Sequence, residues 1–210
     1  ERLPKFKTLL ISGGEPFMRN DLPEIINLFY KNNEVRTIGI PTNSLLGNII
    51  IEKVKIILDQ NKDLNLDINL SLDGLEEDHD YVRGVPGNFK KVMELIDKLA
   101  ELKKQGYKFN VMLNSLICKR NYINLMELAL SMKNEYGDRI NMHVFEIIRG
   151  DAKDLTEKEL SNVQVKEIFN KLFRFQVENY LSRDNRFLRK ILSIGSLSTK
   201  YNLQYKAFQN

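Results

Sequence analysis

The regular alternation of strand-like and helix-like segments is the feature that most constrains how this chain can fold. Short apolar runs typical of buried strands are centred on Leu9, Ile38, Leu70, Leu113 and Val144. Amphipathic helical patterns follow the first four of them, at Leu22–Lys31, Ile49–Asp59, Phe89–Lys104 and Tyr122–Glu135. Each repeat, about thirty to forty residues long, leaves room for the helical crossover that joins two parallel strands. The pattern therefore predicts an α/β fold with a parallel sheet.

Polar and apolar residues alternate in the strand from position 67 to position 73, and side chains of a strand point alternately to its two faces. One face carries Asp67, Asn69, Ser71 and Asp73. The other carries Ile68, Leu70 and Leu72. An exposed antiparallel edge would give the same alternation, but the surrounding βα repeats favour a strand that lines the interior of a barrel.

Composition excludes several classes of protein. The 210 residues are 42% hydrophobic and 29% charged, a balance typical of a soluble globular domain. The net charge of +4 is spread without a long basic run, so no nucleic-acid partner is expected. No segment is apolar enough to predict a membrane span or a signal peptide. The single cysteine excludes an intrachain disulfide and favours a cytoplasmic location.

The turn after the first strand is the clearest candidate site. Gly13 and Gly14 allow a tight turn and a close approach of backbone to ligand, and Glu15 adds a carboxylate before Pro16. On these residues alone, a ligand-binding turn and a plain strand-to-helix turn with a solvated glutamate both remain open.

The order of motifs resembles the radical SAM enzymes that carry a C-terminal cysteine-rich SPASM extension. The resemblance rests on Gly13-Gly14-Glu15-Pro16, Ser71-Leu72-Asp73-Gly74, His79-Asp80-Tyr81-Val82-Arg83-Gly84 and Gly87-Asn88-Phe89. It implies a partial (βα)6 barrel similar to a TIM barrel. Residues 1–154 would form the core, and residues 155–210 a helical linker toward the extension.

The same resemblance implies the chemistry. S-adenosylmethionine (SAM) and a [4Fe-4S] cluster would be the cofactors, with an electron donor as partner and a peptide or protein as the expected substrate. The family's Cys-x3-Cys-x2-Cys loop is absent, and Cys118 is the only cysteine. We therefore expect an internal fragment of a longer enzyme, with its cluster ligands upstream and no activity of its own.

Six residues are the expected SAM contacts: Gly13, Gly14, Glu15, Asn43, Ser71 and Asn114. The glycines and Glu15 would hold the methionyl amine. Asn43 stands in a Thr-Asn-Ser sequence where related enzymes often have Thr-Asn-Gly. Ser71 has two open interpretations, namely a contact to a ribose or carboxylate of the ligand and a hydroxyl that is hydrogen-bonded to the backbone. Asn114 is either a ligand contact or a structural amide.

Other polar residues have structural interpretations. Asp73 and Gly74 are expected to shape a turn, and Cys118 to be a small buried residue. His79 lies in an acidic loop and is expected to be exposed. Arg83 has three open interpretations, namely a SAM carboxylate contact, a solvated loop residue and a partner of Asp80.

Two other functions remain open at this stage. One is a degenerate barrel that binds an adenosyl ligand without catalysis, and the other is an unrelated α/β interaction domain.

Overall fold

A computed structural model of the chain describes residues 3–148 and 154–180. Its five parallel strands form one sheet in the order β1-β2-β3-β4-β5, which confirms the predicted α/β class. The chain divides into two compact units. The first unit comprises residues 1–71 and 87–113, and the second comprises residues 72–86 and 114–210.

The first unit contains three complete strands and three long helices. Its elements are β1 (Thr8–Leu10), the 3-10 helix η1 (Pro16–Met18), α1 (Leu22–Asn32), β2 (Thr37–Thr42), α2 (Gly47–Gln60), β3 (Asn65–Ser71) and α4 (Asn88–Lys104). Strand β4 (Asn110–Ile117) begins in this unit and ends in the second. The predicted strands and helices of this region are all present.

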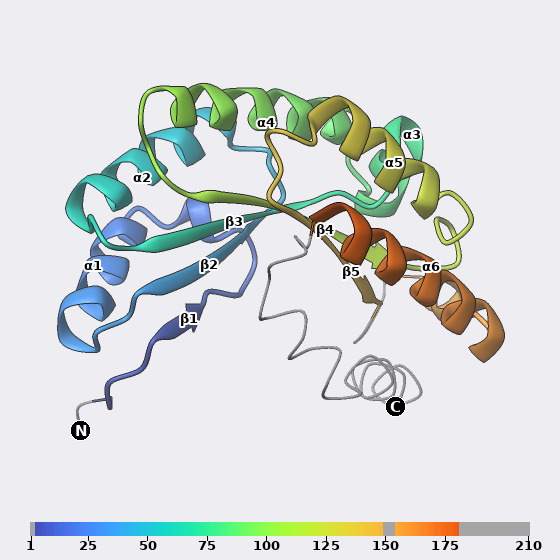
Figure 1. Ribbon diagram of the computed structural model, residues 1–210, viewed down its shortest axis with the longest axis horizontal. Helices are drawn as coiled ribbons and strands as arrows, with labels where there is room; N and C mark the ends of the chain where they lie inside the picture. Colours follow the sequence, from blue (N-terminus) through green and yellow to red (C-terminus); the bar gives the residue numbers. More distant parts are fainter. Residues whose placement is uncertain (1–2, 149–153, 181–210) are drawn as a thin grey trace. The chain divides into compact units, whose positions relative to one another are not determined.

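Parallel pairing holds these strands in register. Leu9 lies opposite Ile38, and Ile40 lies opposite Ile68. Helices α2 and α4 contact each other and cover the sheet (Figure 1). The side chains that fill the core from β2 and β3 are aliphatic and buried: Ile38, Ile40, Leu66, Ile68 and Leu70. Removing these branched side chains from water is the main favourable term in folding the unit.

Strand β3 has the predicted division between its faces. Leu66, Ile68 and Leu70 are buried, whereas Asp67, Asn69 and Ser71 are half-buried. Asn110 on β4 donates from Nδ2 to Asp67 Oδ1 at 2.7 Å. The polar face of the strand is thus a second, distinct surface of the sheet.

The second unit contains a short helix that precedes β4 in the sequence, the end of β4, and the elements after it. These are α3 (Glu76–Arg83), α5 (Leu125–Tyr136), β5 (Met142–Ile147), the 3-10 helix η2 (Leu155–Lys158) and α6 (Asn162–Tyr180). Helix α6 packs against β5 and α5 (Figure 1). Its buried face carries Val165, Ile168, Phe169, Leu172 and Phe175.

Two details of the second unit differ from the sequence-based expectation. Helix α3 was not predicted, because eight residues rich in charge show no apolar stripe. The predicted helix Tyr122–Glu135 begins later, at Leu125, with Asn124 as its N-cap. The sequence pattern also predicts a helix near residues 187–194, which lie outside the described residues. No helix in the described ranges combines the length and apolarity that a membrane crossing requires.

A buried histidine lies in the core of the second unit. The Ser115 hydroxyl donates to the Leu72 carbonyl, and its oxygen lies 2.7 Å from His143 Nε2. Because a hydroxyl has one hydrogen to donate, the Nε2 atom must carry the imidazole proton. The other nitrogen, Nδ1, is buried and has no hydrogen-bond partner among the described residues. Burial lowers the pKa of His143 to about 3, since a proton on Nδ1 would place a charge in the core.

We predict that His143 makes the fold sensitive to acid. Its pKa is about 3 in the folded chain, and about 6.5 in an unfolded chain. The unfolded state therefore binds the extra proton between these values, so stability falls as pH is lowered through this window. One such group makes the free energy of unfolding change with pH by up to about 1.4 kcal/mol per pH unit.

The measurement is the free energy of unfolding in urea from pH 7 to pH 4, for the wild type and for His143→Gln. The variant should show the shallower dependence on pH. An NMR titration of the His143 ring gives an independent check, because the ring signal should not move above pH 4. Parallel unfolding curves together with a titrating ring would contradict the assignment.

Candidate functional site

The turn that follows β1 exposes bare backbone. Gly13 and Gly14 are both exposed, and Gly13 has a φ of +127°, a conformation that side-chain-bearing residues rarely adopt. A Cβ atom added to either glycine would have no heavy atom within 4 Å. Peptide groups on both sides of the turn are therefore accessible to a ligand.

Glu15 fixes this turn in place. Its Oε1 atom accepts from the Phe17 N–H at 3.2 Å, which caps η1. Its Oε2 atom accepts from the Thr42 hydroxyl at 3.0 Å and from the Asn43 N–H at 2.7 Å. Hydrogen bonds to a carboxylate are among the stronger ones in proteins. The side chain thus ties the glycine turn to the carboxyl end of β2.

Asn43 is held by three hydrogen bonds. Besides its N–H bond to Glu15, its Oδ1 atom accepts from the Leu45 N–H at 3.0 Å. Its carbonyl accepts from Asn88 Nδ2 at 2.9 Å. The next residue, Ser44, has a φ of 66°. This left-handed conformation is the one that a glycine would adopt freely, so the backbone keeps the shape of a Thr-Asn-Gly turn without the glycine.

Ser71 lies at the same edge of the sheet in the first unit. Thr42 pairs with Leu70 in the parallel ladder, so Asn43 and Ser71 follow equivalent ends of β2 and β3. Ligand sites of α/β folds gather at the carboxyl ends of their strands. The first unit therefore brings together five of the six expected contacts. The sixth, Asn114, belongs to the second unit, where its Oδ1 atom is buried without a hydrogen-bond partner among the described residues.

A polar network in the second unit was not predicted. Asp73 is fully buried; its Oδ2 atom lies 2.6 Å from Arg83 Nε, and its Oδ1 atom accepts from the Leu116 N–H at 2.7 Å. Asn121 Nδ2 donates to the Asp73 carbonyl at 2.7 Å. Burial raises the pKa of Asp73, while the Arg83 charge and the Leu116 N–H oppose that rise. Asp73 therefore does more than shape a turn, and Arg83 pairs with it.

The expectation that His79 is exposed was wrong. Its side chain is fully buried, and its Nδ1 atom accepts from the Asp73 N–H at 3.0 Å. The acidic neighbours that suggested a solvated loop instead occupy the first turn of α3, where the helix dipole favours negative charge. A helix in this segment places His79 one turn beyond Leu75, on the face of α3 that turns toward the protein interior.

No metal centre is formed by the described ranges, since they hold no group of three His, Cys, Asp or Glu residues arranged for a metal ion. Cys118 is buried as expected. Its burial raises the pKa of the thiol to about 12. The thiolate is the metal-binding form of cysteine, so this residue stays protonated and unreactive at neutral pH.

Comparison with known proteins adds independent evidence. Residues 1–129 match the profile of the Radical SAM superfamily. A probable GTP 3',8-cyclase of Methanococcus aeolicus is 38% identical over 170 residues, covering 72% of this chain and 54% of that protein. An AdoMet-dependent heme synthase of Methanosarcina barkeri is 29% identical over 175 residues, covering 81% and 45%.

A solved structure, described as native anSMEcpe with bound AdoMet and Cp18Cys peptide, has a similar fold. The TM-score is 0.55 at 18% identity, over 83% of this chain and 47% of that one. At this identity the similarity concerns the fold alone. The chain spans about half the length of each of these three proteins.

We predict that Glu15→Gln destabilises the first unit. The amide keeps one acceptor oxygen but turns an NH2 group toward the N–H and hydroxyl donors that the carboxylate served. Loss of such charge-assisted bonds should cost about 1.5–3 kcal/mol of unfolding free energy. Urea denaturation measures it, with Glu101→Gln on the exposed side of α4 as the control. Equal stability of both variants would show that the carboxylate does not hold the turn.

Proposed function

This chain belongs to the radical SAM superfamily, and on that premise we propose that the full-length protein is a radical SAM enzyme. The family implies S-adenosylmethionine and a [4Fe-4S] cluster as cofactors. The cluster, when bound, supplies the electron that cleaves the sulfonium bond of SAM. In the full-length protein, that chemistry would provide a 5′-deoxyadenosyl radical able to take a hydrogen atom from the substrate, and 5′-deoxyadenosine would be the product.

The observation that carries the proposal is the exposed glycine turn held against the end of β2. Gly13 and Gly14 leave room for the methionyl end of SAM to approach the backbone. A backbone carbonyl in the turn can accept a hydrogen bond from the methionyl ammonium of SAM, and the Glu15 carboxylate adds negative charge beside that ammonium. Both oxygens of Glu15 already accept hydrogen bonds from the chain. Its contribution to the ligand is therefore mainly to position the turn.

Asn43 and Ser71 extend the proposed site along the same strand ends. Asn43 is fixed through its N–H, its carbonyl and its Oδ1 atom, which leaves its side-chain NH2 group available as a donor. Ser71 is half-buried on the polar face of β3. Its hydroxyl can donate to or accept from a ribose or carboxylate.

The cluster does not fit the residues of this chain. Iron–sulfur clusters are held by cysteine thiolates, and the sequence contains one cysteine, with its thiol pKa raised to about 12. We therefore expect the ligands of the cluster in parts of the full-length protein outside these 210 residues, and we assign no step at the cluster to the present residues.

We further propose a peptide or protein as the substrate, with an electron donor as the second partner. The support is the resemblance of the motif order to that of SPASM-type enzymes and the similar fold of anSMEcpe, whose structure contains a peptide. The assignment of residues 1–154 to the core and 155–210 to a linker is part of the same proposal.

A nucleotide substrate is the second candidate. It is favoured by the 38% identity to the probable GTP 3',8-cyclase. The two candidates differ in the molecule that loses a hydrogen atom, so labelled substrates separate them.

We predict that Gly14→Val weakens SAM binding without unfolding the protein. The added side chain meets no protein atom within 4 Å of its Cβ, yet it occupies the space through which the ligand would reach the backbone. SAM affinity of the full-length protein should fall at least about tenfold, equivalent to about 1.4 kcal/mol. Equilibrium dialysis with labelled SAM measures it. Lys62→Val, in the turn before β3, is the control and should bind normally. Unchanged affinity in Gly14→Val would remove the turn from the site.

We also predict that the full-length protein, reconstituted anaerobically with iron and sulfide and then reduced, releases 5′-deoxyadenosine from SAM, whereas the 210-residue chain does not. Deuterated peptides and deuterated GTP are supplied in separate reactions. Deuterium in 5′-deoxyadenosine from the peptides supports the first candidate, and deuterium from GTP supports the second. A protein with an intact cluster that releases no 5′-deoxyadenosine would favour a non-catalytic adenosyl-binding barrel.

A further inference from the structure

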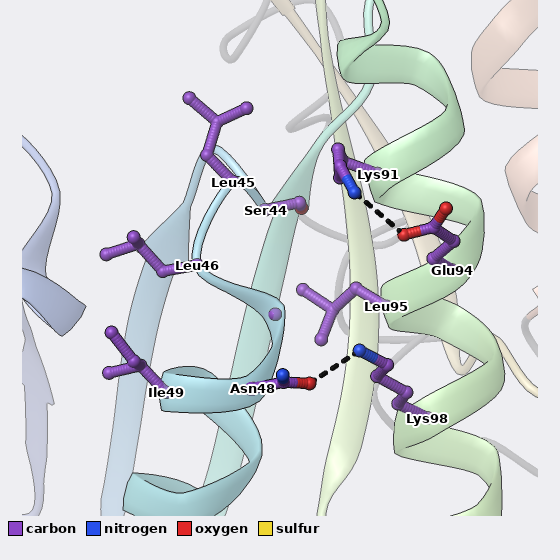
Figure 2. A pocket seen from close by; sticks show the side chains of 10 residues that line it. Ser44, Leu45, Leu46, Asn48, Ile49, Lys91, Glu94, Leu95 and Lys98 are labelled. Atoms are coloured by element: carbon purple, nitrogen blue, oxygen red, sulfur yellow. Dashed lines mark hydrogen bonds and ion pairs between the residues drawn. The ribbon is translucent and has the colours of Figure 1, made fainter.

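The first unit contains a pocket that the proposed SAM site does not use. It has a volume of about 360 Å³ and lies between the start of α2 and one face of α4. Figure 2 shows the side chains of Lys91, Glu94, Leu95 and Lys98 entering it from α4. The segment from Ser44 to Ile49 forms the opposite wall. The pocket is therefore built from a helix N-terminus and a charged helix face.

The backbone N–H groups at the start of α2 are not capped by the side chain of the N-cap residue. Leu46 is the N-cap residue and makes no capping hydrogen bond through its side chain. The N–H groups of the first helical residues have no partner within the helix. Three of these residues, Gly47, Asn48 and Ile49, line the pocket. The helix dipole adds partial positive charge at this end, which favours an anion.

Ser44 is an independent indication of a ligand. The residue is fully buried, and its Oγ atom has no hydrogen-bond partner among the described residues. It lines the pocket, and Figure 2 shows its side chain pointing toward α4. A buried hydroxyl without a partner costs about 1–3 kcal/mol. A ligand oxygen in the pocket would satisfy this hydroxyl.

Two lysines supply the formal positive charge. Positions 91, 94, 95 and 98 fall on one stripe of α4, because residues three, four and seven apart share a helix face. Lys98 Nζ lies 2.6 Å from Asn48 Oδ1, so it reaches across to the start of α2. Lys91 pairs with Glu94 at 3.1 Å, and this hydrogen bond lowers the pKa of the Glu94 carboxyl. Glu94 thus offsets part of the positive charge.

We propose that this pocket binds a phosphate group. Backbone N–H groups, a free hydroxyl and two ammonium groups give it several donors of different geometry, which suits the many acceptor oxygens of a phosphate better than the two of a carboxylate. Gly47 lies close to Lys98, since a Cβ there would lie 3.7 Å from Lys98 Nζ. The site shares no residue with the glycine turn after β1.

The test is calorimetric titration of the full-length protein with inorganic phosphate at constant ionic strength. Acetate and chloride are titrated in the same way. Phosphate should bind saturably, and neither other anion should match it. Ser44→Ala and Lys98→Gln should weaken phosphate binding, and Glu94→Gln should strengthen it, each by about two- to fivefold. Lys104→Gln, on the same helix outside the pocket, should leave the affinity unchanged.

Several results would overturn the proposal. Affinity that is equal in all four variants would place the phosphate elsewhere. Acetate that binds as tightly as phosphate would remove the phosphate assignment. SAM affinity is measured in parallel in Lys98→Gln and in Gly14→Val. Because only Gly14→Val alters the glycine turn, the failure of one site is distinguishable from the failure of the other.

Discussion

The arrangement of the first unit depends on the Glu15 carboxylate. Two segments that are 27 residues apart in sequence meet through its bond to Thr42, and the neighbouring Asn43 N–H completes the contact. A glycine turn has high conformational entropy when it is free. Three hydrogen bonds to one side chain remove that freedom, so the exposed peptide groups of the turn are preorganised for a ligand.

Much of the fold could be predicted because its signals are local. The alternation in β3 requires only that neighbouring side chains point to opposite faces, and Leu66, Ile68 and Leu70 are indeed the buried set. Five strand positions and four helices followed from apolar periodicity in the same way. The positions of Gly13, Gly14 and Asn43 near the carboxyl ends of β1 and β2 could be predicted, because the topology of parallel sheets brings such positions to one edge. Their contact with a ligand stays a prediction.

The remainder could not be predicted because it depends on partners distant in sequence. Asp73 accepts from Leu116, which lies 43 positions further along the chain, and no local pattern reveals such a bond. His79 looked solvated because its neighbours are charged, although only its own face of α3 turns inward. The hydrogen bonds that Glu15 accepts from Thr42 and Asn43 likewise join residues distant in sequence.

Ser44 shows how backbone strain can mark a functional position. A left-handed conformation with a φ of 66° is nearly free for glycine, but costs a residue with a Cβ atom roughly 1–2 kcal/mol. The hydroxyl gains no hydrogen bond from the described protein in return. Glycine here would be the more stable choice for folding alone. A selection for stability in the absence of ligand should therefore favour glycine at position 44. Enrichment of glycine there would show that the serine serves a purpose other than folding stability.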